Sequence, residues 1–145
     1  MILISHRGNI NGKNTHRENH PDYIDEAIKA GYDVEVDVWV KNDLVYLGHD
    51  SPDTLIPVQW LTDRYSKLWV HCKNTEALVY LKEKESLNVF WHEEDIVTLT
   101  SKSYIWAYPG KQPIEKSIAV MPELHSDDLS KCIGVCSDYV KNYIL

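Results

Sequence analysis

The stretch GYDVEVDVWV, residues 31 to 40, decides the fold of this chain. Its valines alternate with Glu35, Asp37 and Trp39. Alternation with a period of two is typical of a β-strand, because successive side chains leave a strand on opposite faces. Glu35 and Asp37 therefore point to the same side, away from the valines. Burying two negative charges on the inner face of a sheet costs free energy unless a positive partner meets them. The stretch therefore predicts a strand that carries a binding or catalytic site.

Length and composition favour one compact domain over residues 1–145. The chain has 145 residues, of which 43% are hydrophobic, enough for a packed core. Its 22 acidic and 15 basic residues give a net charge of −7, which disfavours nucleic acid or an anionic membrane as the main partner. A small phosphate ligand remains compatible with this charge, because a few local cations can hold it.

The cysteines and the hydropathy pattern indicate a cytoplasmic protein. The three cysteines, Cys72, Cys132 and Cys136, are odd in number and form no CxxC motif, so we expect free thiols in a reducing compartment. No apolar run approaches the roughly 20 residues of a membrane span, so we expect no stable membrane insertion. The start, MILISHRG, has no basic region or small-residue cleavage pattern and predicts no signal peptide.

Short β-branched runs alternate with helical patterns along the chain. The predicted strands cover residues 1–5, 33–39, 44–47, 68–71, 88–91, 117–121 and 133–136. The predicted helices cover residues 21–30, 57–65, 75–85 and 138–145, with a helical turn at 127–131. Residues 95–107 are compatible with a β-hairpin or with a single strand at 104–107.

This order of elements predicts an α/β barrel. Alternating strands and helices are typical of a parallel sheet, and seven or eight strands favour a barrel over an open sheet. A TIM-type (β/α) barrel has about 250 residues, so a chain of this length must lack several outer helices. We therefore expect an abridged TIM-like barrel with mostly parallel strands. Missing helices leave apolar strand faces uncovered, so we also expect self-association into a homo-oligomer.

Polar residues follow most of the predicted strands. They are His6, Arg7, Glu35, Asp37, His49, Asp50, His71, Lys73, His92, Glu93, Glu94, Tyr108, Glu123 and Asp138. The active sites of barrel enzymes lie at the carboxyl ends of the strands. The sequence therefore predicts that these side chains gather at one end of the barrel.

Four motifs in this set resemble those of the glycerophosphodiester phosphodiesterase family. They are HRG at residues 6–8, EN at 18–19, EVD at 35–37 and HD at 49–50. The resemblance covers residues 2–53 and continues weakly at 70–73, where the family has Glu-x-Lys, and at 136–138, similar to its terminal Thr-Asp. It implies a barrel, a divalent cation such as Mg²⁺ or Ca²⁺, and a role in lipid metabolism as a phosphoric diester hydrolase.

The residue chemistry agrees with this implied activity. Glu35 and Asp37 suit a hard cation with open positions for phosphate oxygens. Arg7 can hold phosphate with its planar fork, and Lys73 can add a point charge. The resemblance implies that His6 and His49 are the acid/base pair, and either of them could be the base. A further pair, Trp106 and Tyr108, is compatible with the core or with a wall of the substrate pocket.

One position departs from the family. His71 stands where the family has a third acidic metal ligand, and an imidazole binds Mn²⁺ or Zn²⁺ more readily than Mg²⁺ or Ca²⁺. Glu18, Glu93 or Glu123 could supply the missing oxygen, and we prefer Glu123. The identity of the metal and of its third ligand stays open.

Three functions remain open from the sequence. The first is a metal-dependent phosphodiesterase that hydrolyses a small glycerol- or lipid-derived phosphodiester. The second is a sphingomyelinase-D-like lyase, which shares the two-histidine framework and cyclises its phosphodiester. The third is a non-catalytic barrel that binds phosphate through Arg7 and Lys73. We expect a structural role for His92.

Overall fold

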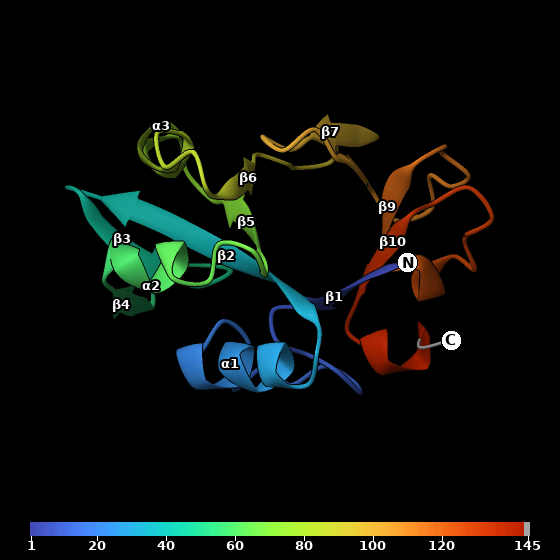
Figure 1. The fold of residues 1–145 in the computed structure, drawn as a ribbon, viewed down its shortest axis with the longest axis horizontal. Coiled ribbons are helices and arrows are strands. Elements are labelled where there is room, and N and C mark those ends of the chain that lie inside the picture. Colours follow the sequence, from blue (N-terminus) through green and yellow to red (C-terminus); the bar gives the residue numbers. More distant parts are fainter. Residues whose placement is uncertain (144–145) are drawn as a thin grey trace.

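A computed structural model describes residues 1–143 as a mixed α/β fold built around one curled sheet (Figure 1). Its strands are β1 (Ile2–His6), β2 (Asp33–Lys41), β3 (Leu44–Leu47), β4 (Thr54–Ile56), β5 (Leu68–Cys72), β6 (Asn88–Phe90), β7 (Val97–Leu99), β8 (Ile105–Ala107), β9 (Ser117–Val120) and β10 (Gly134–Ser137). Its helices are α1 (Pro21–Lys29), α2 (Val58–Thr62), α3 (Thr75–Lys82) and the short 3₁₀ helices η1 (Pro122–Leu124) and η2 (Val140–Tyr143).

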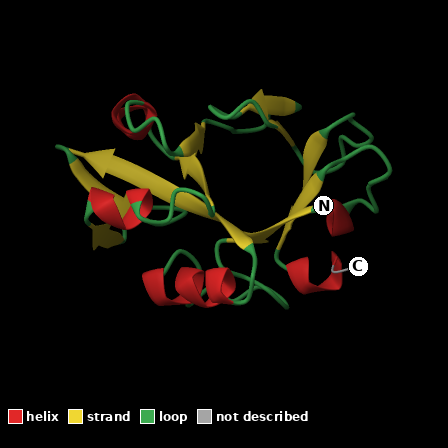
Figure 2. Cartoon of the chain, viewed as in Figure 1, coloured by secondary structure: helices red, strands yellow, loops and turns green. Residues whose placement is uncertain are grey.

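The sheet curls into a partial barrel with β1 in the middle (Figure 2). On one side of β1 lie β2, β5 and β6, and on the other β10, β9 and β8, and all these neighbours pair in parallel. The pairing is antiparallel where β3 and β4 extend from β2 and where β7 pairs with β8. Between β6 and the β7–β8 hairpin, the Ser101 N–H donates to the Val89 carbonyl over 2.8 Å.

The two faces of β2 separate the packing into two layers. On the outer face, Val34, Val36 and Val38 are fully buried in a cluster that also contains residues of α1, α2 and α3. The inner face is packed by a second cluster from six strands: Ile4, Trp69, Phe90, Trp106, Ile118 and Cys136. Alternate residues of β2 thus serve the core and the site, as the period of two predicts.

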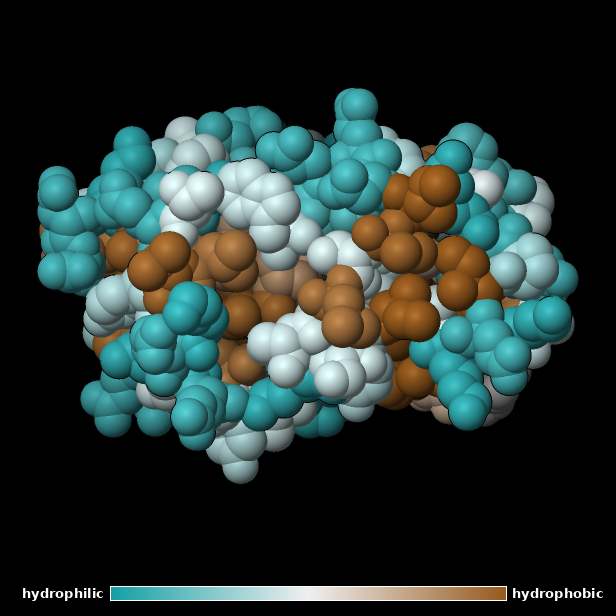
Figure 3. All heavy atoms as spheres, turned by 90° about the horizontal axis from the view of Figure 1, so that it is seen from above, coloured by the Kyte–Doolittle hydropathy of each residue, from teal (hydrophilic) through white to brown (hydrophobic). Residues whose placement is uncertain are grey.

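The helices are few, as the length of the chain predicts. Between β6 and residue 143 the only helical segments are η1 and η2. The outer faces of β8, β9 and β10 are nevertheless covered, since Ala107, Ala119 and Val135 are fully buried. Exposed apolar side chains remain around β7, where Ile96 and Leu99 are 60% and 65% exposed, and hydrophobic surface is visible from that side (Figure 3). Self-association stays a prediction.

Several local predictions need correction. Of the two alternatives for residues 95–107, the structure has the hairpin, formed by β7 and β8. The predicted turn at 127–131 is not helical, because the Asp128 side chain accepts the Ser130 N–H over 2.9 Å and competes with a helical hydrogen bond. The predicted closing helix is the 3₁₀ helix η2, and its last predicted residues, 144–145, lie outside the described part. Strand β4 was not predicted.

The described residues contain no helix long and apolar enough to span a membrane.

Candidate metal centre and cavity

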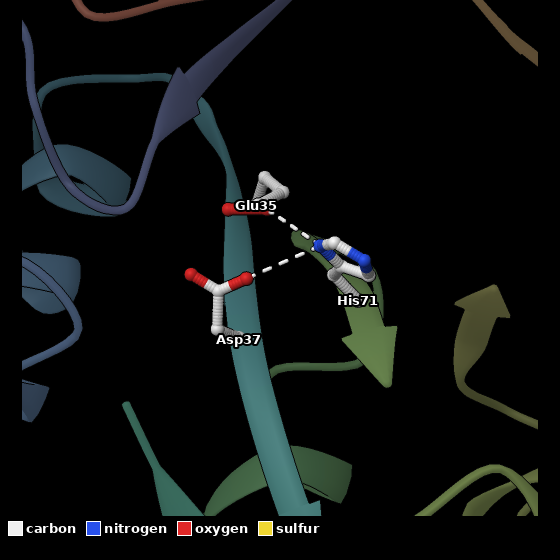
Figure 4. Close-up of side chains that lie close together, drawn as sticks. All are labelled: Glu35, Asp37 and His71. Carbon is white, nitrogen blue, oxygen red and sulfur yellow. Dashed lines mark ion pairs between the residues drawn. The ribbon is translucent and has the colours of Figure 1, made fainter. Parts of the chain in front are cut away.

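Glu35, Asp37 and His71 form a compact group inside the curled sheet (Figure 4). Strands β2 and β5 are parallel neighbours, and their register places His71 directly beside Asp37. One donor atom from each of the three residues lies within 4.8 Å of the others. Glu35 is 3% exposed and Asp37 is fully buried. The predicted inward orientation of the two carboxylates is confirmed, and His71 joins them.

Two cationic side chains face these carboxylates. The Arg7 guanidinium Nε lies 3.0 Å from Asp37 Oδ2, and His71 Nδ1 lies 3.2 Å from Asp37 Oδ1 and 3.7 Å from Glu35 Oε2. The Asn19 amide also donates to Asp37 Oδ2 over 2.9 Å. Burial disfavours the Asp37 carboxylate, but these neighbours outweigh it and hold its pKa far below the ordinary range.

The protonation of His71 follows from its second nitrogen. Its Nε2 lies 2.9 Å from the backbone carbonyl of His92, which can only accept, so Nε2 carries a proton. Nδ1 therefore faces two carboxylates either as a second N–H or as a lone pair directed at a cation. Burial opposes the charged ring, but hydrogen bonds to Asp37 and Glu35 raise the pKa of His71 to about 9. The same atom can thus hold a proton or a metal ion.

Glu35 is the less satisfied of the two acids. Its Oε1 is buried and has no hydrogen-bond partner among residues 1–143, and its Oε2 is 3.7 Å from His71. A buried carboxylate oxygen without a partner is unusual, since such groups are costly. It is the free ligand atom that a metal centre requires.

The two histidines of the resemblance are each paired with an aspartate through Nδ1. His6, at the end of β1, lies 2.7 Å from Asp138 Oδ1, and Asn9 donates to the same oxygen over 2.8 Å. His49 lies 2.8 Å from Asp50 Oδ1. Both histidines therefore keep Nε2 for a ligand. Their environments differ, because the His6 side chain is 15% exposed and that of His49 is 41% exposed.

Burial and hydrogen bonding act in opposite directions on His6. Burial lowers its pKa, but the hydrogen bond to Asp138 and the charge of Glu35 raise it above the ordinary value of 6.5. The ring is therefore protonated over a wider pH range than an exposed histidine.

One cavity of about 410 Å³ collects nearly all the predicted site residues at the carboxyl ends of the strands. The predicted residues that line it are His6, Arg7, Glu35, His49, His71, Lys73, Trp106 and Tyr108. Asp37 is not among them, because it is fully buried next to Arg7 and His71. Tyr108 contributes to the wall, whereas Trp106 is 3% exposed and also belongs to the inner core.

The structure does not bring Glu123, our preferred third acidic ligand, into this group. Glu123 lies in η1, and its carboxylate accepts hydrogen bonds from Ser137 Oγ over 2.8 Å and from Tyr143 over 3.0 Å. The alternative Glu18 bonds Arg7 over 3.1 Å, and Glu93 lies at the exposed rim of the cavity.

Sequence reasoning missed the contacts by which three residues position the site, and it had considered one of them, Glu18, only as a metal ligand. Asp138 orients His6, Asn19 holds Asp37, and Glu18 holds Arg7. The signal for Asn19 and Glu18 was the EN motif, and for Asp138 the motif at 136–138. No partner had been predicted for any of them, because each partner is distant in sequence.

No family model, curated protein or solved structure matches this chain.

Proposed function

We propose that this chain is a metal-dependent phosphodiesterase on an abridged TIM-type barrel, acting on a small phosphodiester. The observation that carries the proposal is a single cavity lined by His6, His49, Arg7 and Lys73 next to the candidate metal ligands. Phosphodiester cleavage needs these groups together: an acid, a base and positive charge around the phosphoryl group.

The charge count of the site supports a bound cation. Among the groups that ion pairs join at this site, Arg7 and protonated His71 face three carboxylates, which leaves one negative charge in surplus, and two once His71 Nδ1 is a metal ligand. The carboxylates are Glu18, Glu35 and Asp37. Two carboxylates and an imidazole suit Mn²⁺ or Zn²⁺, while Mg²⁺ or Ca²⁺ would need more oxygen ligands. Such an ion supplies Lewis-acid polarisation of a phosphoryl oxygen.

In this proposal the two histidines have different tasks. His6, with its raised pKa, holds the proton that the leaving alkoxide receives when its P–O bond breaks. The more exposed His49 accepts the proton of the water that forms the new P–O bond. Asp138 and Asp50 keep each ring oriented through Nδ1. Arg7 and Lys73 bind the phosphate oxygens.

Hydrolysis of bis(p-nitrophenyl) phosphate and of glycerophosphocholine tests this function. We expect turnover that needs Mn²⁺, Zn²⁺, Mg²⁺ or Ca²⁺, stops in EDTA, and is lost in His6→Ala and Glu35→Gln. The exposed His16→Ala is the matched control and should retain the activity. Activity that persists in EDTA or in both site variants would overturn the proposal. Phosphorus NMR of the products separates hydrolysis from a sphingomyelinase-D-like reaction, which would release a cyclic phosphate.

One observation favours the second candidate, a phosphate-binding barrel without catalysis. Arg7 and His71 form ion pairs with Asp37 at 3.0 and 3.2 Å, so protein side chains alone can neutralise this carboxylate. This reading predicts that inorganic phosphate binds equally well in EDTA and in Mn²⁺, without turnover of either ester. Calorimetric titration with phosphate under both conditions, with Arg7→Lys for comparison, distinguishes the two candidates.

A further inference from the structure

Asn9, in the loop after β1, is a fully buried asparagine whose amide joins several parts of the site. Its Nδ2 donates to Asp138 Oδ1 over 2.8 Å and to Glu18 Oε1 over 3.3 Å. Its Oδ1 accepts the hydroxyl of Tyr23 over 3.0 Å and the backbone N–H of Asn14 over 3.1 Å. An asparagine amide offers two donors and two acceptor lone pairs, so all four positions are used. These contacts hold the amide in one orientation.

The two donors of this amide lead to two different groups of the cavity. Asp138 Oδ1, which accepts the first, also lies 2.7 Å from His6 Nδ1. Glu18, which accepts the second, uses its other oxygen to accept a hydrogen bond from Arg7 over 3.1 Å. Arg7 has a φ of 59°, which is uncommon for an arginine, so tertiary contacts have to hold it in place. One amide thus anchors both the partner of His6 and the partner of Arg7.

Tyr23 ties the same amide to helix α1. Its ring packs on Gly8, where a Cβ would lie 2.5 Å from the ring and the φ is +97°, so only glycine leaves room for this contact. The next residue of α1, Ile24, is fully buried in the outer core cluster. The amide of Asn9 is therefore fixed to the core of the protein as well as to its own loop.

We infer that Asn9 is a positioning residue that sets His6 and Arg7 in one arrangement around the phosphate. This inference rests on the proposed function, in which His6 transfers the proton and Arg7 binds the phosphate oxygens. A residue that positions both groups affects both kcat and KM, because catalysis depends on small displacements of the reacting groups. A residue that only holds its loop together would change the stability and leave both constants of the folded protein unchanged.

Kinetics with bis(p-nitrophenyl) phosphate in Mn²⁺ test the inference. Asn9→Ala should lower kcat by about tenfold or more and also raise KM. Adding Asp138→Asn should lower kcat little further, and adding Glu18→Gln should raise KM little further, because each pair acts through one contact. Asn11→Ala, at an exposed position of the same loop, is the matched control and should keep both constants. An unchanged kcat or an unchanged KM in folded Asn9→Ala overturns the inference.

Binding of inorganic phosphate separates failure of the inference from failure of the proposed function. Phosphate affinity is measured by calorimetry, and the ring nitrogen signals of His6 are followed by NMR. If the wild type hydrolyses no ester, but Asn9→Ala weakens phosphate binding and shifts the His6 signals while Asn11→Ala does neither, the enzymatic proposal fails and the inference stands. The same affinity and signals in Asn9→Ala as in the wild type overturn the inference, and a wild type that binds no phosphate overturns both.

A second variant covers the case in which Asn9→Ala does not fold. Tyr23→Phe removes the hydroxyl that donates to Asn9 and keeps the ring that packs on Gly8. It should shift the His6 signals and weaken phosphate binding in the same direction, by a smaller amount. Wild-type values for both measurements in Tyr23→Phe would then overturn the inference.

Discussion

Replacing Glu35 by glutamine should stabilise the metal-free protein, and replacing Asp37 by asparagine should destabilise it. The two acids lie two residues apart on β2 and are almost equally buried, but their contacts differ. Asp37 pairs with Arg7 at 3.0 Å and with His71 at 3.2 Å, and accepts a hydrogen bond from Asn19 at 2.9 Å. Glu35 has one long contact with His71 at 3.7 Å and an oxygen without a partner in residues 1–143.

The expected magnitudes follow from these contacts. Removing the charge of Asp37 leaves Arg7 and His71 without their shared partner in a buried place, which costs about 3–5 kcal/mol. Removing the charge of Glu35 takes away the surplus negative charge of the site and its desolvation cost, a gain of about 1–2 kcal/mol. Both substitutions replace a carboxylate by the amide of the same length, so the opposite signs of the two changes in unfolding free energy report the different contacts of Glu35 and Asp37.

Urea unfolding at pH 7 in EDTA measures both effects as changes in the free energy of unfolding. Repeating the titration with Mn²⁺ adds the second half of the test: the ion should stabilise the wild type and leave both variants unchanged, because each lacks a ligand. If Glu35→Gln proves as destabilising as Asp37→Asn in EDTA, Glu35 is a structural residue. The assignment of its free oxygen to a metal ion would then be wrong.

Three further outcomes are expected. The raised pKa of His71 contributes stability that is complete below pH 6.5 and is lost as the pH rises through about 9, so in EDTA the free energy of unfolding should fall by about 3 kcal/mol over that range. Urea unfolding at a series of pH values measures this fall, and His71→Gln should flatten the profile. Gly48→Ala should disorder the loop that carries His49, because a Cβ at its φ of +155° would overlap the Ser51 carbonyl; loss of the His49 NMR signals from their folded positions would show it. Asn74→Ala should cost about 1–2 kcal/mol in thermal unfolding, since Asn74 caps α3 and also bridges to β2.

The sequence was a good guide wherever a local pattern carries the information. The alternation in β2 predicted which side chains are buried in the core and which face the site, and Asn74 was recognisable as the start of α3. The motif order placed His6, His49 and Lys73 around one cavity. Such features depend on the geometry of a few consecutive residues or on the carboxyl ends of parallel strands meeting at one end of a sheet.

The sequence was a poor guide to the choice among chemically equivalent groups. Glu123 was as plausible a ligand as any other strand-end acid, but the structure ties it to Ser137 and Tyr143. His92 was expected to be structural, yet its ring has no hydrogen-bond partner in the described chain. Whether a polar side chain is satisfied depends on all its neighbours in space, and no local pattern encodes that.

By itself, then, the sequence determined that two carboxylates on an inner strand face the inside of an α/β fold, because the period of a strand is independent of the rest of the chain. Only the tertiary structure decided what meets them. The register between β2 and β5 places His71 beside Asp37, and the turn after β1 brings Arg7 to the same carboxylate. The pairing of β1 with β10 joins His6 to an aspartate 132 residues away. These contacts are set by strand order and register, which arise when the whole sheet assembles.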